Sequence, residues 1–200
     1  LGQITQEELL ARIYSKWADV MRNKDNQLLE INKVLKERAT KFEELSVIDN
    51  LTGIHNRLKF EQELKSEIER FKRYKTETFS IALLDIDNFK KINDTYGHLE
   101  GDNVLKKLVQ IVNANLRNSD LFSRWGGEEF IIIFPLTSIK KAEIAAENIR
   151  KSICEKKFDV VGKVTCSFGL TQFQENDTFH SVVIKADKAM YKAKTSGKNK

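Results

Sequence analysis

Carboxylates stand where two buried strands are predicted to begin or end. In FSIALLDID, a nearly continuous apolar run ends in Asp85 and Asp87. In RWGGEEF, Glu128 and Glu129 lie between two glycines and the apolar run FIIIF. Residues two apart on a strand point to the same face. We therefore expect Asp85 and Asp87 to share a face, whereas the adjacent Glu128 and Glu129 should point to opposite faces.

This pattern predicts a cation site next to an anion site. If the glycine hairpin pairs beside the first strand, Glu128 reaches the same rim as Asp85. Mg²⁺ binds through one or two carboxylates and fills its other positions with water and phosphate oxygens. Gly126 and Gly127 leave room for a bulky anion, and their backbone N–H groups can point to it. Taken alone, GGEE could also be an ordinary Gly-Gly hairpin turn with solvated acids.

The composition is that of a protein with a hydrophobic core. Of the 200 residues, 40% are hydrophobic and 32% are charged, which argues against a disordered or fibrous chain. The longest apolar run, residues 130–136, is far shorter than the roughly 18 residues of a membrane span. The sequence starts at Leu1 without a signal-peptide pattern. We expect a cytoplasmic location, alone or within a larger membrane-bound sensor, and a missing upstream region.

Net charge and cysteine content say little about the type of ligand or metal that the protein binds. The net charge of +5 is spread along the chain, which suits a small phosphate-bearing ligand as well as a nucleic acid. Cys154 and Cys166 lack the spacing of a zinc site, so we predict reduced structural thiols, with a disulfide or a metal role as the alternatives.

Residues 1–46 are predicted to form a helical linker, because residues 6–46 contain no Gly or Pro. Apolar residues recur there every seven positions, with interruptions at Lys24 and Arg38. This stripe is too narrow for a globular core and fits a parallel coiled coil of two chains. A helix docked on its own domain and a remnant of a sensor bundle are the alternatives. The stripe residues are Leu10, Tyr14, Trp17, Met21, Leu28, Ile31, Leu35, Phe42 and Leu45.

The remaining chain alternates helical and strand patterns. The order is helix, strand, helix, helix, hairpin, helix, strand, helix, which predicts an α+β domain with a mixed or antiparallel sheet covered by helices. The assigned segments are a helix over 57–74 capped by Asn56, a strand over 79–87, helical spacing over 98–116, a hairpin around Gly126 and Gly127, a helix over 138–156, a strand over 164–173 and a helix over 178–195.

Six segments together resemble the GGDEF family of diguanylate cyclases, with the signature in its GGEEF form. They are DNLTGIHNR, DIDNFKKIND, YGHLEGDNVL, RWGGEEF, SFG and ADKAMYKAKTSGKN. The resemblance covers about residues 47–199, and the preceding helix resembles the family's signalling helix. It implies that residues 47–200 are a diguanylate cyclase domain. The implied fold is palm-like, related to nucleotidyl cyclases, with a central five-stranded mixed or antiparallel sheet flanked by helices.

The implied reaction condenses two GTP molecules into cyclic di-GMP and two pyrophosphates. By matching position, the resemblance assigns magnesium binding to Asp85, the carbonyl of Ile86 and the carboxylate of Glu128. It implies two Mg²⁺ per site, with Mn²⁺ as a possible substitute. Glu128 would also accept a proton, and Lys90 would place positive charge near the reacting phosphate.

The resemblance also assigns the substrate contacts. Asn93 and Asp102 would read guanine, because a carboxylate and an amide complement its N–H and carbonyl groups. His98 would lie near the ribose or base; the alternative is a structural histidine at a helix start. Lys194 and Lys198, expected one helical turn apart, would contact the terminal phosphates. A solvated basic tail is the alternative for these lysines.

A regulatory site is implied by Arg117 and Asp120, which match the family's inhibitory R-x-x-D motif. There a guanidinium and a carboxylate could bind the product, cyclic di-GMP. A surface loop with a local ion pair is the alternative. The family's second arginine is not obvious, since Arg150 does not fall clearly in register. Trp125 replaces the usual Tyr or Phe, and we expect this change to affect packing alone.

Each site would hold one GTP, so two domains must face each other. The helix would raise their effective concentration as a homodimer, under an upstream sensor absent from this chain. A silent nucleotide receptor is the alternative, opposed by the intact motif residues. A nucleic-acid enzyme is opposed by the lack of a concentrated basic patch, so no nucleic-acid partner is expected. An ATP-specific cyclase would be expected to alter Asp102.

Overall fold

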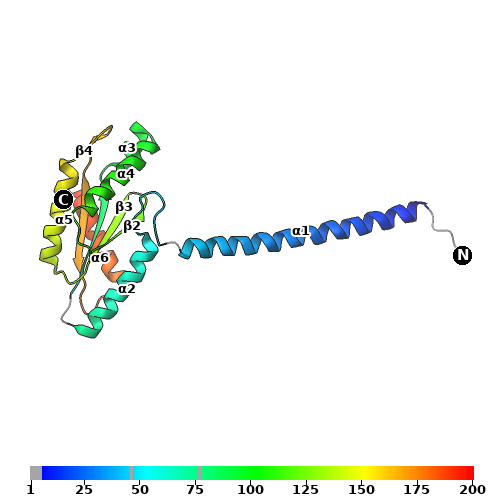
Figure 1. The fold of residues 1–200 in the computed structure, drawn as a ribbon, viewed down its shortest axis with the longest axis horizontal. Coiled ribbons are helices and arrows are strands. Elements are labelled where there is room, and N and C mark those ends of the chain that lie inside the picture. The colour runs from blue at the N-terminus through cyan, green and yellow to red at the C-terminus, as the bar shows by residue number, and fades with distance from the viewer. Residues whose placement is uncertain (1–5, 46, 76–77) are drawn as a thin grey trace. The chain divides into compact units, whose positions relative to one another are not determined.

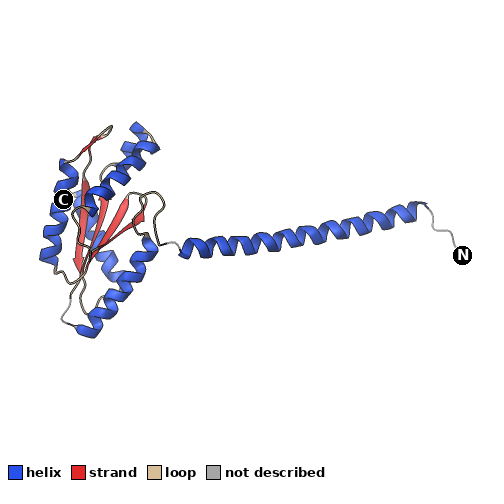
Figure 2. Cartoon of the chain, in the orientation of Figure 1, coloured by secondary structure: helices blue, strands red, loops and turns tan. Residues whose placement is uncertain are grey.

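Helix α1 (Gln6–Leu45) forms one unit of the chain by itself, and residues 47–200 contain the other (Figure 1). The computed structural model describes residues 6–45, 47–75 and 78–200. Figure 2 colours helices and strands by type. The elements of the second unit are α2 (Arg57–Tyr74), β1 (Ser80–Ile86), α3 (Phe89–Tyr96), α4 (His98–Asn113), β2 (Leu121–Gly126), β3 (Glu129–Phe134), α5 (Ile139–Glu155), β4 (Lys157–Phe158), β5 (Gly162–Lys163), β6 (Cys166–Gln172) and α6 (Phe179–Thr195).

The predicted long helix is present as α1, which is continuous over 40 residues. Its apolar stripe is exposed: the described members, from Leu10 to Leu35, have between 41% and 69% of their surface accessible. The side chains of Phe42 and Leu45, and residue Ser46, lie outside the described part of the chain. None of the described helices is long and apolar enough to cross a membrane.

The central sheet is antiparallel and has four strands, in the order β2-β3-β1-β6. The α+β fold class is confirmed. The expected count of five strands is wrong for the described residues, because β4 and β5 pair only with each other. Each of these strands is two residues long, and the short turn between them lets the pair satisfy its own hydrogen bonds away from the main sheet.

Helices cover both faces of the sheet. Apolar side chains of α4 and α5 pack against one face, with Leu84 and Ile86 of β1. Side chains of α2 and α6 pack against the other face, with Ile81 and Leu83. Every residue of β1 is buried, which explains why this strand is apolar on both faces until it reaches Asp85.

The signature hairpin turns one residue later than predicted. Gly126 is the last residue of β2 and pairs with Glu129, so the two turn residues are Gly127 and Glu128. The register shifts between Arg124 and Gly126, which makes Trp125 a bulge in β2. Gly127 has a φ of +51°, a left-handed conformation that glycine adopts without strain.

Two helices connect β1 to the hairpin. α3 had no range assigned from the sequence, and α4 ends at Asn113 rather than at 116. Gly97, with a φ of +86°, separates them, because a residue in this conformation cannot continue a right-handed helix. This break lets α3 and α4 pack against each other, which matters for two predicted site residues.

The two cysteines, predicted to be structural thiols, are not paired with each other in the structure. Cys154 and Cys166 are both free thiols, and Cys166 is fully buried at the start of strand β6. Burial raises the pKa of the Cys166 thiol well above its usual value, with a further contribution from Asp87 and Asp85. A thiol in this environment stays protonated and unreactive.

The N-terminus of α6 depends on buried Asp177. Burial alone would raise the pKa of this carboxyl, but hydrogen bonds from Lys185, Ser181 and the backbone N–H of Gln174 lower it overall. The folded pKa therefore lies below that of the unfolded chain, about 3.8. The stabilisation from the charged form is present above that pH and is lost as the pH falls through the folded pKa.

Asp177→Asn is expected to lower the free energy of unfolding at pH 7 by about 1.5–3 kcal/mol, the usual contribution of hydrogen bonds to a charged group. The difference from the parent should shrink as the pH falls below about 4, because the parent then loses the same charge. Denaturant unfolding of both proteins between pH 3 and 7 measures this. A constant difference across that range would contradict the assignment.

Candidate active site

The predicted acidic rim lies where β1 and β3 meet. Asp85 is 4% exposed and sits directly opposite Glu129 across the two strands. The backbone N–H of Ile86 donates to the carbonyl oxygen of Glu128 at 3.4 Å. Lys194 of α6 places its Nζ 2.7 Å from Asp85 Oδ2. The end of β1, the signature turn and the end of α6 therefore converge.

Electrostatics at this rim are dominated by burial and by repulsion between carboxylates. Burial raises the pKa of Asp85, Lys194 opposes this effect, and Glu128 and Asp87 add to it. The pKa of Glu129 is also raised, first by burial and then by Asp85. Since Lys194 only partly compensates these groups, additional positive charge would stabilise the ionised rim.

The donor set fits a hard divalent cation that also binds a phosphate. The carboxylates of Asp85 and Glu128 and the carbonyl of Ile86 offer oxygen donors of the kind that Mg²⁺ prefers. Among the residues that the structure describes, no group of three or more His, Cys, Asp or Glu side chains is arranged to hold a metal. An ion at this rim would therefore need oxygen atoms from substrate and water to complete its coordination.

Glu129 is a component of the rim to which the sequence assigned no role. As the first residue of β3 it faces Asp85 on the α6 side of the sheet, and Asp187 of α6 also raises its pKa. The period of a strand predicts that Glu128 and Glu129 diverge, but only the register of β1 against β3 reveals which of them lies opposite Asp85.

Asn93 and Asp102, the predicted base readers, lie on α3 and α4, respectively, and Gly101, the neighbour of Asp102, packs close to Asn93. Gly101 is buried against α3, and a Cβ at this position would lie 1.9 Å from Asn93 Oδ1 and 3.3 Å from Phe89. The Oδ1 atom of Asn93 is buried and has no hydrogen-bond partner. An acceptor in this state is costly to leave unpaired. Asn93 therefore offers a free buried carbonyl, and the half-buried Asp102 offers a carboxylate on the neighbouring helix.

Lys90 and His98 are exposed residues at the starts of α3 and α4, respectively. The structure places His98 next to Gly97, at the break between these helices. Both side chains are thus on the solvent side of the helical pair that carries Asn93 and Asp102.

Lys194 and Lys198 are not one helical turn apart as predicted. Lys194 lies in the last turn of α6, which ends at Thr195, and Lys198 follows the helix with a φ of +61°. Gly197 allows the chain to leave the helix here. The Nζ of Lys198 donates to Asn88 Oδ1 at 2.5 Å, beside the end of β1. The two lysines therefore reach the same rim from different backbone conformations.

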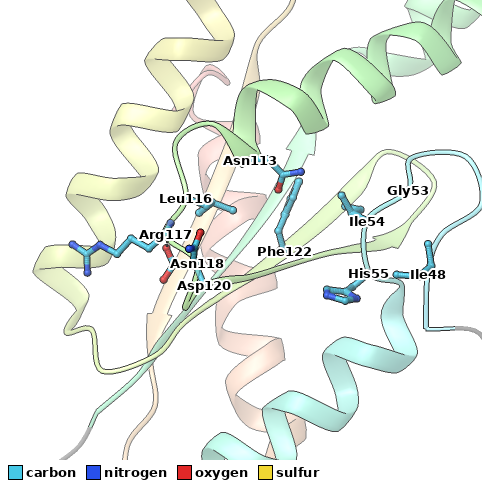
Figure 3. A pocket seen from close by; sticks show the side chains of 10 residues that line it. All are labelled: Ile48, Gly53, Ile54, His55, Asn113, Leu116, Arg117, Asn118, Asp120 and Phe122. Carbon is cyan, nitrogen blue, oxygen red and sulfur yellow. Dashed lines mark hydrogen bonds between the residues drawn. The ribbon is translucent and has the colours of Figure 1, made fainter.

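Arg117 and Asp120 line a separate cavity of about 400 Å³ between the loop at residues 48–55, the end of α4 and the start of β2 (Figure 3). The backbone N–H of Arg117 donates to Asp120 Oδ2 at 2.9 Å. In Figure 3 the Arg117 guanidinium extends away from the other lining side chains. The backbone N–H of Asp120 also donates to the Arg117 carbonyl at 3.0 Å, so both hydrogen bonds use the Arg117 backbone, and Arg117 is an exposed residue.

Arg150, the uncertain candidate for a second inhibitory arginine, has a different role. Its guanidinium makes two hydrogen bonds to Glu147, at 2.7 and 2.8 Å, and one to Asn199 Oδ1 at 2.7 Å. Only 16% of its side chain is exposed. This arginine is therefore committed to contacts within the domain.

Arg124 makes contacts that the sequence did not predict and that hold the signature turn in place. The Arg124 guanidinium donates to the Gly127 carbonyl, at 2.7 and 3.0 Å, and to both carboxylate oxygens of Asp49, at 3.1 and 3.2 Å. Burial would raise the pKa of Asp49, but hydrogen bonds from Thr52 and the charge of Arg124 lower it overall. Arg124 thus ties the turn that carries Glu128 to the segment that follows α1 in the sequence.

Comparison with known proteins identifies the family. Residues 46–200 match the family model described as "Diguanylate cyclase, GGDEF domain". The diguanylate cyclase VdcA of Vibrio cholerae is 33% identical over 207 residues, covering 96% of this chain and 59% of VdcA. The response regulator PleD of Caulobacter vibrioides is 36% identical, covering 98% of this chain and 42% of PleD. The chain thus spans less than two thirds of the length of these curated relatives.

A solved structure agrees in fold. The crystal structure of the coiled coil and GGDEF domain of DgcB from Caulobacter crescentus, in complex with c-di-GMP, has a TM-score of 0.73 and 28% sequence identity. The match covers 96% of this chain and 97% of that one. The match therefore includes both the long N-terminal helix and the domain that follows it.

Proposed function

Because the chain belongs to the GGDEF family, we propose that it is a diguanylate cyclase, which condenses two GTP molecules into cyclic di-GMP and releases two pyrophosphates. The observation that carries this proposal is the convergence at one rim of buried Asp85, the signature turn and Lys194. Carboxylates and a lysine that meet in this way suit a nucleoside triphosphate bound with a divalent cation.

The rim residues divide the work of phosphoryl transfer. Asp85, the Ile86 carbonyl and Glu128 are the proposed cation ligands. Bound Mg²⁺, with two ions per site proposed and Mn²⁺ as a substitute, would neutralise phosphate charge and acidify the attacking 3′ hydroxyl. Glu128 would accept the proton of that hydroxyl. Lys194 exchanges its ion pair with Asp85 for contacts to the terminal phosphates when substrate and cation bind.

Positive charge on both sides of the rim completes the phosphate site. Lys198, which lies beside Asn88, is the second proposed contact for the terminal phosphates. Lys90 of α3 is proposed to stabilise charge that develops on the reacting phosphate, since a fixed cation is most effective where charge increases in the transition state.

Guanine is proposed to bind between α3 and α4. The unpartnered Oδ1 of Asn93 can accept a hydrogen bond from a guanine N–H group, while Asp102 can accept from the neighbouring donors. His98 is proposed to lie near the ribose or base. A base without these donors would leave buried acceptors unpaired, which disfavours adenine.

Gly101→Ala is expected to weaken GTP binding by about tenfold or more. The new methyl group would overlap the flexible end of Asn93, which must move away from its position against α4. Losing one net hydrogen bond of about 1.4 kcal/mol corresponds to tenfold in affinity. Calorimetric titration with GTP measures this, with Gln110→Ala on the exposed side of α4 as the control. Unchanged affinity for GTP would contradict the base site.

Catalysis is proposed to occur in a homodimer. One rim positions one GTP, so its 3′ hydroxyl must meet the α-phosphate of a GTP held by a second copy. The exposed apolar stripe of α1 supports a parallel coiled coil as the link between copies, because two chains could bury it together. This link would raise the effective concentration of one domain at the other. An upstream sensor is proposed to control it.

Arg117 and Asp120 are proposed as a product-inhibition site. Arg117 is exposed, so its guanidinium is available to a phosphate or guanine of cyclic di-GMP. The structure of the similar protein DgcB was solved in complex with c-di-GMP, which supports the proposal that this chain binds its product. Because Arg150 is held by Glu147 and Asn199, we propose that this site lacks a second arginine from α5 and binds product weakly. We further propose that the domain works in the cytoplasm.

Incubation of the purified chain with GTP and Mg²⁺, after removal of bound nucleotide, tests the activity. We expect chromatography to show cyclic di-GMP from the parent with GTP, and no cyclic dinucleotide with ATP. Glu128→Gln should give no product, because it removes the proposed ligand and proton acceptor. Absence of product from the parent at high protein concentration, where dimers form, would instead support a nucleotide receptor.

A further inference from the structure

Asp87, the residue that directly follows β1, makes its contacts within the domain. It is 5% exposed, and its carboxylate accepts hydrogen bonds from the hydroxyl groups of Thr165 and Ser167, each at 2.7 Å. It also accepts from the backbone N–H of Asn199 at 3.0 Å. A buried carboxylate with three donors has little capacity left for a cation or a substrate. We therefore consider the segment that Asp87 binds, which contains Asn199.

The side chain of Asn199 is bound by two residues of helix α5. Its side-chain oxygen accepts from Arg150 Nη1 at 2.7 Å, and its Nδ2 donates to Cys154 Sγ at 3.8 Å. Arg150 is itself fixed by its two hydrogen bonds to Glu147. Residue 199 is therefore clamped between the end of β1 and helix α5.

The backbone that these contacts hold is unusual. Lys198 and Asn199 both have left-handed conformations, with φ of +61° and +50°, directly after Gly197 at +115°. Asparagine adopts this region more readily than most residues, but lysine adopts it rarely and retains it where surrounding contacts impose it. The contacts of Asn199 are such constraints, and they set the direction in which the preceding Lys198 leaves the end of α6.

We infer that Asp87, Arg150 and Asn199 form a clasp that positions Lys198 for the terminal phosphates of the substrate. The clasp residues do not touch substrate; they act through Lys198, whose Nζ is thereby held beside Asn88 at the rim. This inference rests on the proposed function, since it takes GTP as the ligand. It makes Arg150, on the opposite side of Asn199 from the rim, a positioning residue for phosphate binding.

The test compares a triphosphate with a monophosphate in the full chain. The probes are a GTP analogue with a methylene group between the α- and β-phosphorus atoms, which is not consumed, and GMP, both with Mg²⁺. Arg150→Ala and Asn199→Ala are each expected to weaken analogue binding about fivefold to tenfold and to change GMP binding less than twofold. Lys151→Ala, which also contacts Glu147 but is exposed, is the matched control and should match the parent.

Coupling between the two positions provides a second measurement. If Arg150 and Asn199 act through one clasp, the double variant should bind the analogue no more weakly than the single variant with the larger loss. The reason is that the effects of substitutions at two contacting residues do not add. Unchanged analogue binding in both single variants would overturn the clasp. A parallel loss for GMP and the analogue would also overturn it, as general damage to the fold. A parent that binds the analogue no better than GMP would overturn the proposed function itself.

Discussion

Asp85→Asn is expected to reduce the initial rate of cyclic di-GMP formation by about a hundredfold or more, the order of magnitude known for removal of one preorganised group that stabilises transition-state charge. The substitution keeps the shape of the side chain but removes the charge that faces Glu129 and pairs with Lys194. Initial rates at saturating GTP and Mg²⁺ measure this. Asp159→Asn, at an exposed ion pair with Lys107, is the control and should keep the parental rate.

Stability separates the loss of a catalytic charge from damage to the fold. Burial raises the pKa of Asp85, so the ionised carboxylate is less favourable in the folded domain than in the unfolded chain. The neutral variant should therefore be at least as stable as the parent at pH 7. Functional groups often lower the stability of the folded state, and their replacement then stabilises the protein. An inactive variant with a markedly lower Tm, or an active variant with the parental rate, would contradict this assignment.

Gly169→Ala is expected to lower Tm by roughly 4–10 °C, from about 2 kcal/mol of overpacking or more. An added Cβ would lie 2.1 Å from the Ala186 carbonyl oxygen and 2.2 Å from the Met190 nitrogen. Both are backbone atoms of α6, so the helix must move away from β6. Lys194, one turn after Met190, would move with it and the cyclase rate should fall.

Thermal denaturation followed by circular dichroism measures the effect of this substitution. Gly126→Ala is the control for stability, because an added Cβ at that position meets nothing within 4 Å. Equal Tm values for the two variants would show that α6 can adjust without cost, which would contradict the tight packing of α6 against β6.

Local patterns predicted the elements that frame the site. The apolar run before Asp85 specified a central strand, the glycines specified a hairpin, and Asn56 specified the start of α2, where its side chain accepts from the Lys59 N–H. Each of these signals is a preference of neighbouring residues, or a period, and requires no knowledge of distant contacts.

Contacts between distant segments could not be predicted in this way. Arg124 and Asp49 are 75 residues apart, and Asp87 and Asn199 are 112 apart. Such contacts depend on strand register and on how helices return to the sheet. The same reason explains Glu129, whose pairing with Asp85 is a property of two strands together. The left-handed conformation of Lys198, next to a residue bonded to distant segments, is likewise not a local preference of lysine.

The bulge at Trp125 shows how a small local irregularity misled the turn assignment. A two-residue Gly-Gly loop is the simplest interpretation of the sequence. The extra residue in β2 moves the turn to Gly127 and Glu128, and so places the proposed catalytic carboxylate in the turn itself rather than on a strand. Trp125 packs edge-on against Phe60 and beneath Arg57, which accounts for an aromatic residue at this position.

The stoichiometry of the reaction tests the central claim most directly. Parent protein and Glu128→Gln would be supplied with GTP and Mg²⁺, and pyrophosphate and cyclic di-GMP would be quantified in the same samples over time. We predict two pyrophosphates for each cyclic di-GMP from the parent and neither product from Glu128→Gln. Pyrophosphate without cyclic di-GMP, or equal formation of product by both proteins, would contradict a cyclase that acts through this rim.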